Sequence, residues 1–305
     1  MKKFLSTIFL LLLIAAIYFY RRDFIQYIMV NYIYKTEFEE KSANNYERSV
    51  DFKYVQVESR FEPKTKQDIL NIIYTALDRG YDDFAFFCSK EYKDCPNDMK
   101  ELIDNNYEIA NINNFVAPYN SYQRLSFAID GYGIIRVHVE KMYTTSEMNL
   151  INQKIEQLYP TLVKSNRSTK DNIKAIHDYI INHTVYLQEE ETGDYLNKSV
   201  HPKKTSIAYG PLFNGAGICG GYTDAMALFL DRMNIPNYRV ASETHIWNLV
   251  YIDGEWKHLD LTWDDPVTDT GVNVLLDTYF LVSSSTLETE NRSEHKYDKA
   301  IYLEA

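Results

Sequence analysis

Four stretches of the chain place apolar residues at the spacing of an amphipathic helix, and each predicts one helix with a buried stripe. They span about residues 65–79, 145–158, 168–183 and 219–233. Gly80 stops the first helix, and Pro160 lies just beyond the second, since both residues commonly mark helix ends. Ser168, with Asp171 three positions later in the place usually taken by Glu, predicts a capping box at the start of the third helix.

Two other stretches alternate apolar and polar residues, which is the period of a β-strand. The sequences QRLSFAI and IIRVHVEKM flank DGYG at residues 130–133 and predict one antiparallel hairpin. The sequence from Thr244 to Asp265 alternates on both sides of Asp253-Gly254, a dipeptide that strongly favours a two-residue hairpin turn.

The N-terminal residues are the most apolar part of the chain. An uncharged run extends from Phe4 to Tyr20, with lysines before it and arginines after it, and it is just long enough to span a bilayer. Ala15 and Ala16 are adjacent and followed by large residues, unlike the small-x-small cleavage site of a signal peptide. We therefore predict an uncleaved single-span anchor over residues 1–22 in the cell membrane. Basic residues at both ends set its orientation only weakly.

Composition narrows the class of protein. With 305 residues, 45% of them hydrophobic, the chain can bury a large core. A net charge of −11 disfavours a nucleic-acid partner, because such binders need a basic face to displace counterions from phosphates. The sequence does not indicate an oligomeric state.

The three cysteines divide into a pair and a single residue. Cys88 and Cys95 are close in sequence, whereas Cys219 stands alone. The first two either pair in an oxidising compartment or stay as buried thiols in a reducing one. Three cysteines cannot form a four-cysteine zinc site.

Cys219 begins the fourth predicted helix and is followed by Gly220 and Gly221. A helix N-terminus stabilises a thiolate through its unpaired amides. Two glycines cost roughly 1 kcal/mol each in a helix interior, so we interpret them as clearance for an approaching backbone or substrate. A small buried hydrophobic residue is the competing interpretation of Cys219.

The hairpin around Asp253-Gly254 sets the register of the residues that follow and precede it. If Ile252 faces Glu255, then Trp247 faces Asp260 and His245 faces Thr262. His245 and Asp260 are then diagonal neighbours on one face, within reach of a hydrogen bond. A slip of one residue would put them on opposite faces.

Cys219, His245 and Asp260 therefore supply a nucleophile, a base and an orienting carboxylate. A metal site is a competing interpretation, but the spacing matches no recognised metal loop, and we predict neither metal nor cofactor. Its ligands would be His245, His258, Asp260, Asp264 and Asp265. His177 and His183 are interpreted as packing or surface residues.

Three separated blocks resemble the bacterial transglutaminase-like superfamily. They are IHDYIINHTVY, GICGGYTDAMALFLDRMNIP and HIWNLVYIDGEWKHLDLTWDDP, within residues 168–283. The resemblance implies an α+β fold with a papain-like core, in which a cysteine at a helix start packs against an antiparallel sheet bearing His and Asp. It makes Cys219 the nucleophile, His245 the histidine and Asp260 the aspartate.

The resemblance also implies an oxyanion site and a lined cleft. The Cys219 amide would be one oxyanion donor, with Tyr209 or Asn214 as candidates for the second. Trp247 and Trp263 resemble aromatic residues that line this cleft, although a core position is an equal alternative for each.

We accordingly predict a membrane-tethered, extracytoplasmic cysteine enzyme acting on protein or peptide amide bonds through a thioester, by hydrolysis or acyl transfer. A binding or scaffold domain with an idle triad is the alternative. The predicted organisation is an anchor, an N-terminal α+β region, a transglutaminase-like domain and a C-terminal tail. Their bounds are residues 1–22, 23–160, 165–285 and 286–305.

Overall fold

The computed structural model describes residues 2–28, 57–58, 61–187, 202–267, 274–289, 293–302 and 305. Helices and antiparallel strands alternate along the chain, so the α+β class is confirmed.

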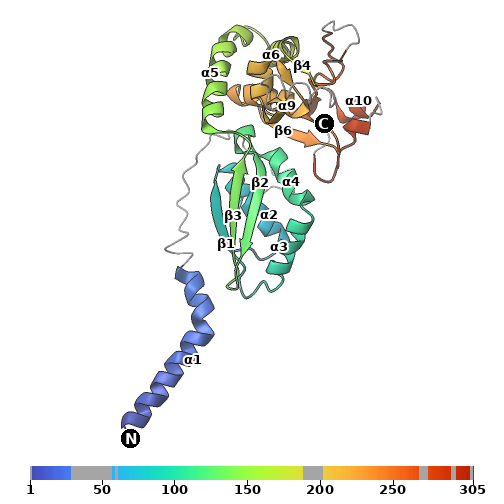
Figure 1. Cartoon of the computed structure of the whole chain (residues 1–305). Coiled ribbons are helices and arrows are strands. Elements are labelled where there is room, and N and C mark those ends of the chain that lie inside the picture. Colours follow the sequence, from blue (N-terminus) through green and yellow to red (C-terminus); the bar gives the residue numbers. More distant parts are fainter. Residues whose placement is uncertain are drawn as a thin grey trace.

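The N-terminal half is a three-stranded antiparallel sheet covered by helices (Figure 1). The strand order is β1-β3-β2, and the predicted hairpin of β2 and β3 is confirmed. The Asp130 carboxylate closes its turn by accepting from the amides of Tyr132 and Ile134, at 2.9 and 3.0 Å. The elements are α2 (Lys66–Asp78), β1 (Asp83–Phe87), α3 (Cys95–Asp104), α4 (Tyr107–Ile112), β2 (Tyr122–Ile129) and β3 (Ile134–Lys141).

The C-terminal half contains a second antiparallel sheet in the order β6-β7-β8, and helix α9 packs against it. Its longer elements are α5 (Thr145–Leu162), α6 (Thr169–His183), α9 (Cys219–Arg232), β6 (Asn237–Ala241), β7 (Ile246–Ile252) and β8 (Glu255–Leu259). Its shorter ones are β4 (Val185–Tyr186), α8 (Pro202–Thr205), β5 (Ala216–Gly217) and α10 (Ser284–Thr289). Short turns of other helix types occur at Asn113–Phe115 (η2), Pro118–Asn120 (η3), Gly210–Asn214 (η4) and Ser293–His295 (η5).

All four predicted helices form, and one end differs from the prediction. Helix α5 continues through Pro160 to Leu162 instead of ending near residue 158. Proline removes one amide donor, but here it lies in the last turn, where the Val163 amide still donates to the Tyr159 carbonyl at 2.8 Å. At the third helix, Ser168 is the N-cap and accepts from the Asp171 amide at 3.0 Å, which is half of the predicted capping box. The Asp171 carboxylate accepts from the Ser168 hydroxyl at 2.7 Å, whereas a capping box has it accept from the Ser168 amide.

The two halves share a hydrophobic core. One buried cluster joins residues of α2, β1 and β3 to Val240 of β6, Trp247 and Leu249 of β7, and Ile301 and Tyr302. Leu287, Ile301 and Tyr302, from the segment that the sequence set apart as a tail, thus contribute to the interior.

Cys88 and Cys95 form a disulfide with a Cα–Cα distance of 5.6 Å, and Cys219 is the free cysteine. The structure therefore has Cys88 and Cys95 paired, and not as two separate buried thiols.

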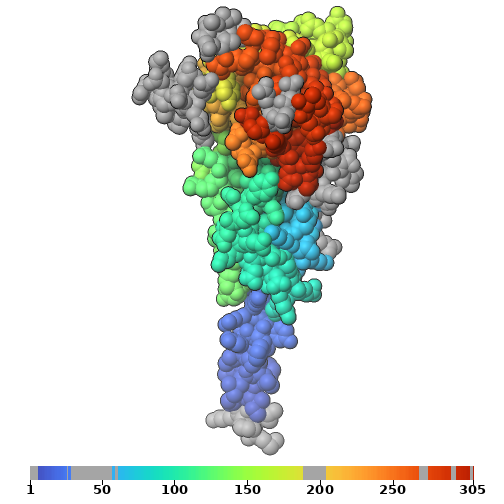
Figure 2. Space-filling model, turned by 90° about the vertical axis from the view of Figure 1, so that its right-hand side faces the viewer, coloured from blue at the N-terminus to red at the C-terminus, as the bar shows by residue number. Residues whose placement is uncertain are grey.

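Helix α1 (Lys2–Ile28) projects from the tip of the first sheet (Figures 1 and 2). Near its end, the Arg22 guanidinium donates to the carbonyls of Tyr132 and Cys88, at 3.0 and 3.2 Å. Large apolar side chains from Ile8 to Phe19 are exposed along it. Within the described residues, no helix combines the length and apolar character needed to cross a membrane.

Candidate active site

Cys219 is the first residue of α9, and the backbone around it is tightly packed. The preceding residue, Ile218, is extended, and its amide donates to the Thr205 carbonyl at 3.0 Å. A Cβ on Gly220 would come within 2.8 Å of the Ser206 carbonyl oxygen, and one on Gly221 would collide with the Thr205 carbonyl oxygen. The two glycines therefore let the backbone of residues 205–207 lie directly against the helix start.

The predicted hairpin register is confirmed. Ile252 pairs with Glu255 and Leu249 with His258. Asp253 and Gly254 both have positive φ, at 54° and 85°, as a type I′ turn requires. His245 lies just before β7 and Asp260 just after β8, so both belong to one end of the hairpin.

The structure brings the three predicted residues together. The Nε2 atom of His245 hydrogen-bonds to Oδ2 of Asp260 at 2.6 Å, and the half-buried Cys219 side chain lies near enough to His245 to raise the pKa of that imidazole. Because Asp260 occupies Nε2, Nδ1 is the ring nitrogen left for the sulfur. This is the geometry of a nucleophile, a base and an orienting carboxylate.

Asp260 is fully enclosed by hydrogen-bond donors. Its Oδ1 accepts from the Thr262 amide at 3.0 Å, the Thr262 hydroxyl at 2.7 Å and the Trp263 amide at 3.3 Å. Its Oδ2 accepts from His245 and also from Nε2 of His295, at 2.8 Å. A carboxylate that receives five donors is held in its ionised form.

The pKa shifts describe a charged pair. Burial alone would lower the pKa of His245, but the Asp260 carboxylate and the Cys219 side chain together raise it to about 10. Burial would raise the pKa of Asp260, whereas the His245 charge and the hydrogen bonds from His245, His295 and Thr262 hold it well below its usual range. At neutral pH His245 is therefore an imidazolium.

The five residues of the metal interpretation do not meet at one point. Asp264 accepts from the Tyr279 amide at 2.9 Å and bonds His177 at 3.2 Å. Asp265 accepts from the Tyr222 hydroxyl at 2.6 Å. His258 bonds Trp247 and Ser284, both near 3 Å, so three of the five have other partners.

The structure assembles a different metal-capable set in the part of the chain it describes. It consists of His245, Asp260 and His295, whose ligand atoms lie within 4.8 Å of one another. The two direct imidazole–carboxylate hydrogen bonds account for that closeness without a cation. His295 was missed by sequence reasoning because it lies 35 positions after Asp260, in a segment without helical or strand periodicity.

The remaining candidates fall into separate environments. Trp247 is buried and stacks on His245, with ring centroids 5.6 Å apart, so it is a core residue. Trp263 is half-buried and lines the hollow beside His245. Tyr209 stacks on Phe213 under Lys204, and Asn214 ends the short turn η4. Neither observation assigns a second oxyanion donor.

Two hollows differ in their relation to the triad. A hollow of about 440 Å³ opens at His245, between Thr244, Thr262, Trp263 and Glu294. Of Cys219, His245 and Asp260, His245 forms part of its wall and the other two do not.

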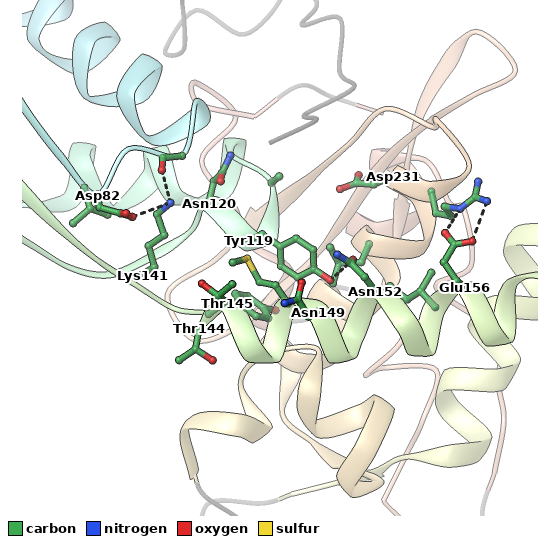
Figure 3. Close-up of a pocket in the computed structure, with 18 residues that line it drawn as sticks. Asp82, Tyr119, Asn120, Lys141, Thr144, Thr145, Asn149, Asn152, Glu156 and Asp231 are labelled. Atoms are coloured by element: carbon green, nitrogen blue, oxygen red, sulfur yellow. Dashed lines mark hydrogen bonds and ion pairs between the residues drawn. The ribbon is translucent and has the colours of Figure 1, made fainter. Parts of the chain in front are cut away.

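A second hollow, of about 970 Å³, lies along α5 and the end of β3 (Figure 3). Four of its charged groups form two ion pairs, Lys141 with Asp82 at 3.2 Å and Arg232 with Glu156 at 2.5 Å. The fifth, Asp231, accepts from the Asn237 amide group at 3.0 Å. The Tyr119 hydroxyl there donates to Asn152 at 2.8 Å. None of the three triad residues lines it.

No protein-family model and no curated protein sequence matches this chain. Among solved structures, similarity extends to a transglutaminase (TGase) at 19% identity, covering 47% of this chain and 44% of that one, with a TM-score of 0.31. It also extends to a candidate cysteine protease from Cytophaga hutchinsonii at 12% identity, covering 50% of this chain and 65% of that one, with a TM-score of 0.29. This chain thus spans less than half of the length of the first protein and less than two thirds of the second.

Proposed function

We propose that the protein is a cysteine enzyme that acts on protein or peptide amide bonds through a thioester. The observation that carries this proposal is the arrangement of a half-buried Cys219 at a helix start, near a His245 whose Nε2 atom is held by the buried Asp260.

The first half of the reaction forms the thioester. The Cys219 thiolate attacks the amide carbonyl carbon, and the carbonyl oxygen takes up the negative charge beside the Cys219 amide, one of the unpaired amides of a helix start. The His245 imidazolium gives its Nδ1 proton to the leaving nitrogen. The carbon–nitrogen bond breaks, a free amine leaves, and the acyl group stays on sulfur.

The second half returns the enzyme to its starting state. Neutral His245 takes a proton from water or from a primary amine, which attacks the thioester carbonyl. The carbon–sulfur bond breaks and the thiolate re-forms beside the imidazolium. Water gives a carboxylic acid, and an amine gives a new amide, so hydrolysis and transfer share every residue of this site. The residues need no cofactor for either outcome.

An electrophilic probe tests the activated thiol. Iodoacetamide at neutral pH should label Cys219 of the full chain at least about 10-fold faster than it labels a free cysteine, because thiols at helix starts and beside imidazolium groups are the reactive ones in proteins. Cys219→Ser should remove labelling and also the release or incorporation of amines from candidate peptides, followed by mass spectrometry. A thiol that reacts no faster than free cysteine would instead support the idle, scaffold alternative.

We also propose that the body of the protein lies outside the cytoplasm, tethered through residues 1–22. The Cys88–Cys95 disulfide supports a location outside the cytoplasm, because disulfides persist in oxidising environments. Thiol counting on the unreduced protein in intact cells should give one free thiol, and externally added protease should reach the body. Three free thiols together with full protection would contradict this location.

A further inference from the structure

The Asp260 carboxylate is shared by two imidazoles at a single oxygen atom. His245 approaches Oδ2 from the end of the hairpin, and His295 approaches it from the short turn η5, at 2.6 and 2.8 Å. We infer that His295 is a positioning residue for the proposed reaction, which fixes the carboxylate that orients His245. The inference rests on the proposed function of Cys219, His245 and Asp260.

His295 is itself held rigidly. Only 5% of its surface is exposed, and its ring lies among Trp247, Trp263 and Tyr279, with centroid distances of 5.2, 5.3 and 4.8 Å. An imidazole packed on aromatic rings loses little further freedom when it donates a hydrogen bond. Its donor is therefore pre-organised toward Asp260.

The second ring nitrogen identifies which form of His295 is present. Its Nδ1 is buried and has no hydrogen-bond partner among the described residues. A proton on Nδ1 would be an unpaired N–H there, at a desolvation cost of about 1–3 kcal/mol or more. The proton on Nε2 is instead donated to the Asp260 carboxylate.

The two oxygens of Asp260 are consequently fixed by different segments. Thr262 and Trp263 hold Oδ1, and His295 holds Oδ2 against rotation. Without His295, Oδ2 would keep only His245, so the carboxylate and the imidazole could swing together as a pair. The sulfur would then lose its fixed partner at Nδ1.

A matched set of variants tests this role on the full chain. His295→Phe keeps the aromatic packing and removes the donor, whereas His295→Gln replaces Nε2–H by an amide donor. His258→Gln is the control, because His258 is also buried in this aromatic cluster but bonds Trp247 and Ser284. If His295→Phe fails to fold, as judged by circular dichroism, His295→Leu takes its place.

The first readout is the rate of Cys219 alkylation by iodoacetamide. We expect His295→Phe to slow it at least about 10-fold, a loss typical of residues that orient a reacting side chain. His295→Gln should recover most of the rate, and His258→Gln should leave it nearly unchanged. Equal rates in wild type and both His295 variants, or equal losses in all three variants, would overturn the inference.

The second readout does not depend on a reactive thiol. The proton shared by His245 and Asp260 should give a far-downfield proton NMR signal, which His295→Phe should move and His295→Gln should largely restore. A signal unchanged by His295→Phe would overturn the inference even if Cys219 proved inert. An inert wild-type thiol with a shifted signal would instead contradict only the proposed function.

Discussion

At Asp260, every neighbouring polar group donates a hydrogen bond and none accepts one. In a catalytic triad, asparagine in place of the aspartate favours the wrong tautomer of the histidine while the geometry is kept. The structure indicates a larger effect, because an amide NH₂ at either oxygen position would face a donor.

We therefore predict that Asp260→Asn both unfolds more easily and loses reactivity at Cys219. The expected loss of stability is about 3 kcal/mol, the usual scale for breaking a buried charged network, measured by urea denaturation. Asp264→Asn is the comparison, since Asp264 is equally buried but bonds His177 and Tyr279. It should lose stability while alkylation of the folded fraction stays near the wild-type rate. Slower alkylation by Asp264→Asn than by Asp260→Asn would contradict the assignment.

A second prediction at this scale concerns pH. Burial lowers the pKa of His258 to about 3. The unfolded chain therefore takes up a proton near pH 6.5 that the folded protein does not bind. Stability from this residue is present above pH 6.5 and is lost as pH falls toward 3, by about 2 kcal/mol between pH 7 and pH 5.

Urea denaturation of wild type and His258→Gln at those two pH values checks this linkage. The drop from pH 7 to pH 5 should be smaller in the variant, whatever its stability at pH 7. His245 has the opposite pH dependence, because its pKa is raised to about 10. Its contribution to stability is fully present below pH 6.5 and is lost as the pH rises toward 10. Identical drops in both proteins would show that His258 is not buried as a neutral ring.

Among the elements, helix α9 depends on the segment at residues 205–207 that lies against its first turn. The Ile218 amide binds the Thr205 carbonyl, and Gly220 and Gly221 give that backbone its space. The position of Cys219 is thus set by a backbone-to-backbone contact and not by its own side chain.

At an ordinary helix position, replacing glycine by alanine stabilises a protein by roughly 1 kcal/mol. We predict that Gly221→Ala has the opposite effect and lowers the free energy of unfolding by more than that amount. The new Cβ would collide with the Thr205 carbonyl oxygen, so thermal unfolding should begin at a lower temperature and alkylation of Cys219 should slow. Gly131→Ala is the matched control, because no atom lies within 4 Å of its added Cβ. An unchanged melting curve for Gly221→Ala would show that the contact is not tight.

Elements also explain what the sequence could and could not predict. The Asp253-Gly254 turn fixes its own register, so the meeting of His245 and Asp260 followed from counting residues along two strands. The helix start at Cys219 followed from apolar spacing. His295 approaches through tertiary packing alone, and no local pattern marks such a residue. The continuation of α5 through Pro160 was not predicted, because proline usually ends a helix but costs little stability in the last turn.

Across the whole molecule, a buried polar network joins the two halves. Arg239 of β6 donates to Asp224 of α9 at 2.9 Å and to the carbonyls of Asn113 and Val116 in the N-terminal half. Tyr143 adds its hydroxyl to the same Asp224, at 2.5 Å. Together with the shared hydrophobic cluster, these contacts couple the candidate site to the first sheet.

We predict that residues 165–305 expressed alone do not fold cooperatively. Trp247 and Leu249 would lose apolar partners from the N-terminal half, and Arg239 would lose two carbonyl acceptors, which leaves a buried charge undercompensated. Residues 57–305 should instead melt in one transition followed by both near- and far-ultraviolet circular dichroism. A cooperative transition of the shorter fragment at the same temperature would show that the halves are independent.

The hydrogen bond between His295 and Asp260 joins two residues that the ribosome adds at different times. Ribosomes add about 5–20 residues each second, so the 35 positions between these residues correspond to about 2–7 s of synthesis. During that interval a nascent chain already carries its thiol, its imidazole and its carboxylate, yet lacks the second histidine. The last hydrogen bond of the site thus forms only after residues 293–295 have emerged, which delays its completion until the body of the protein has been translated.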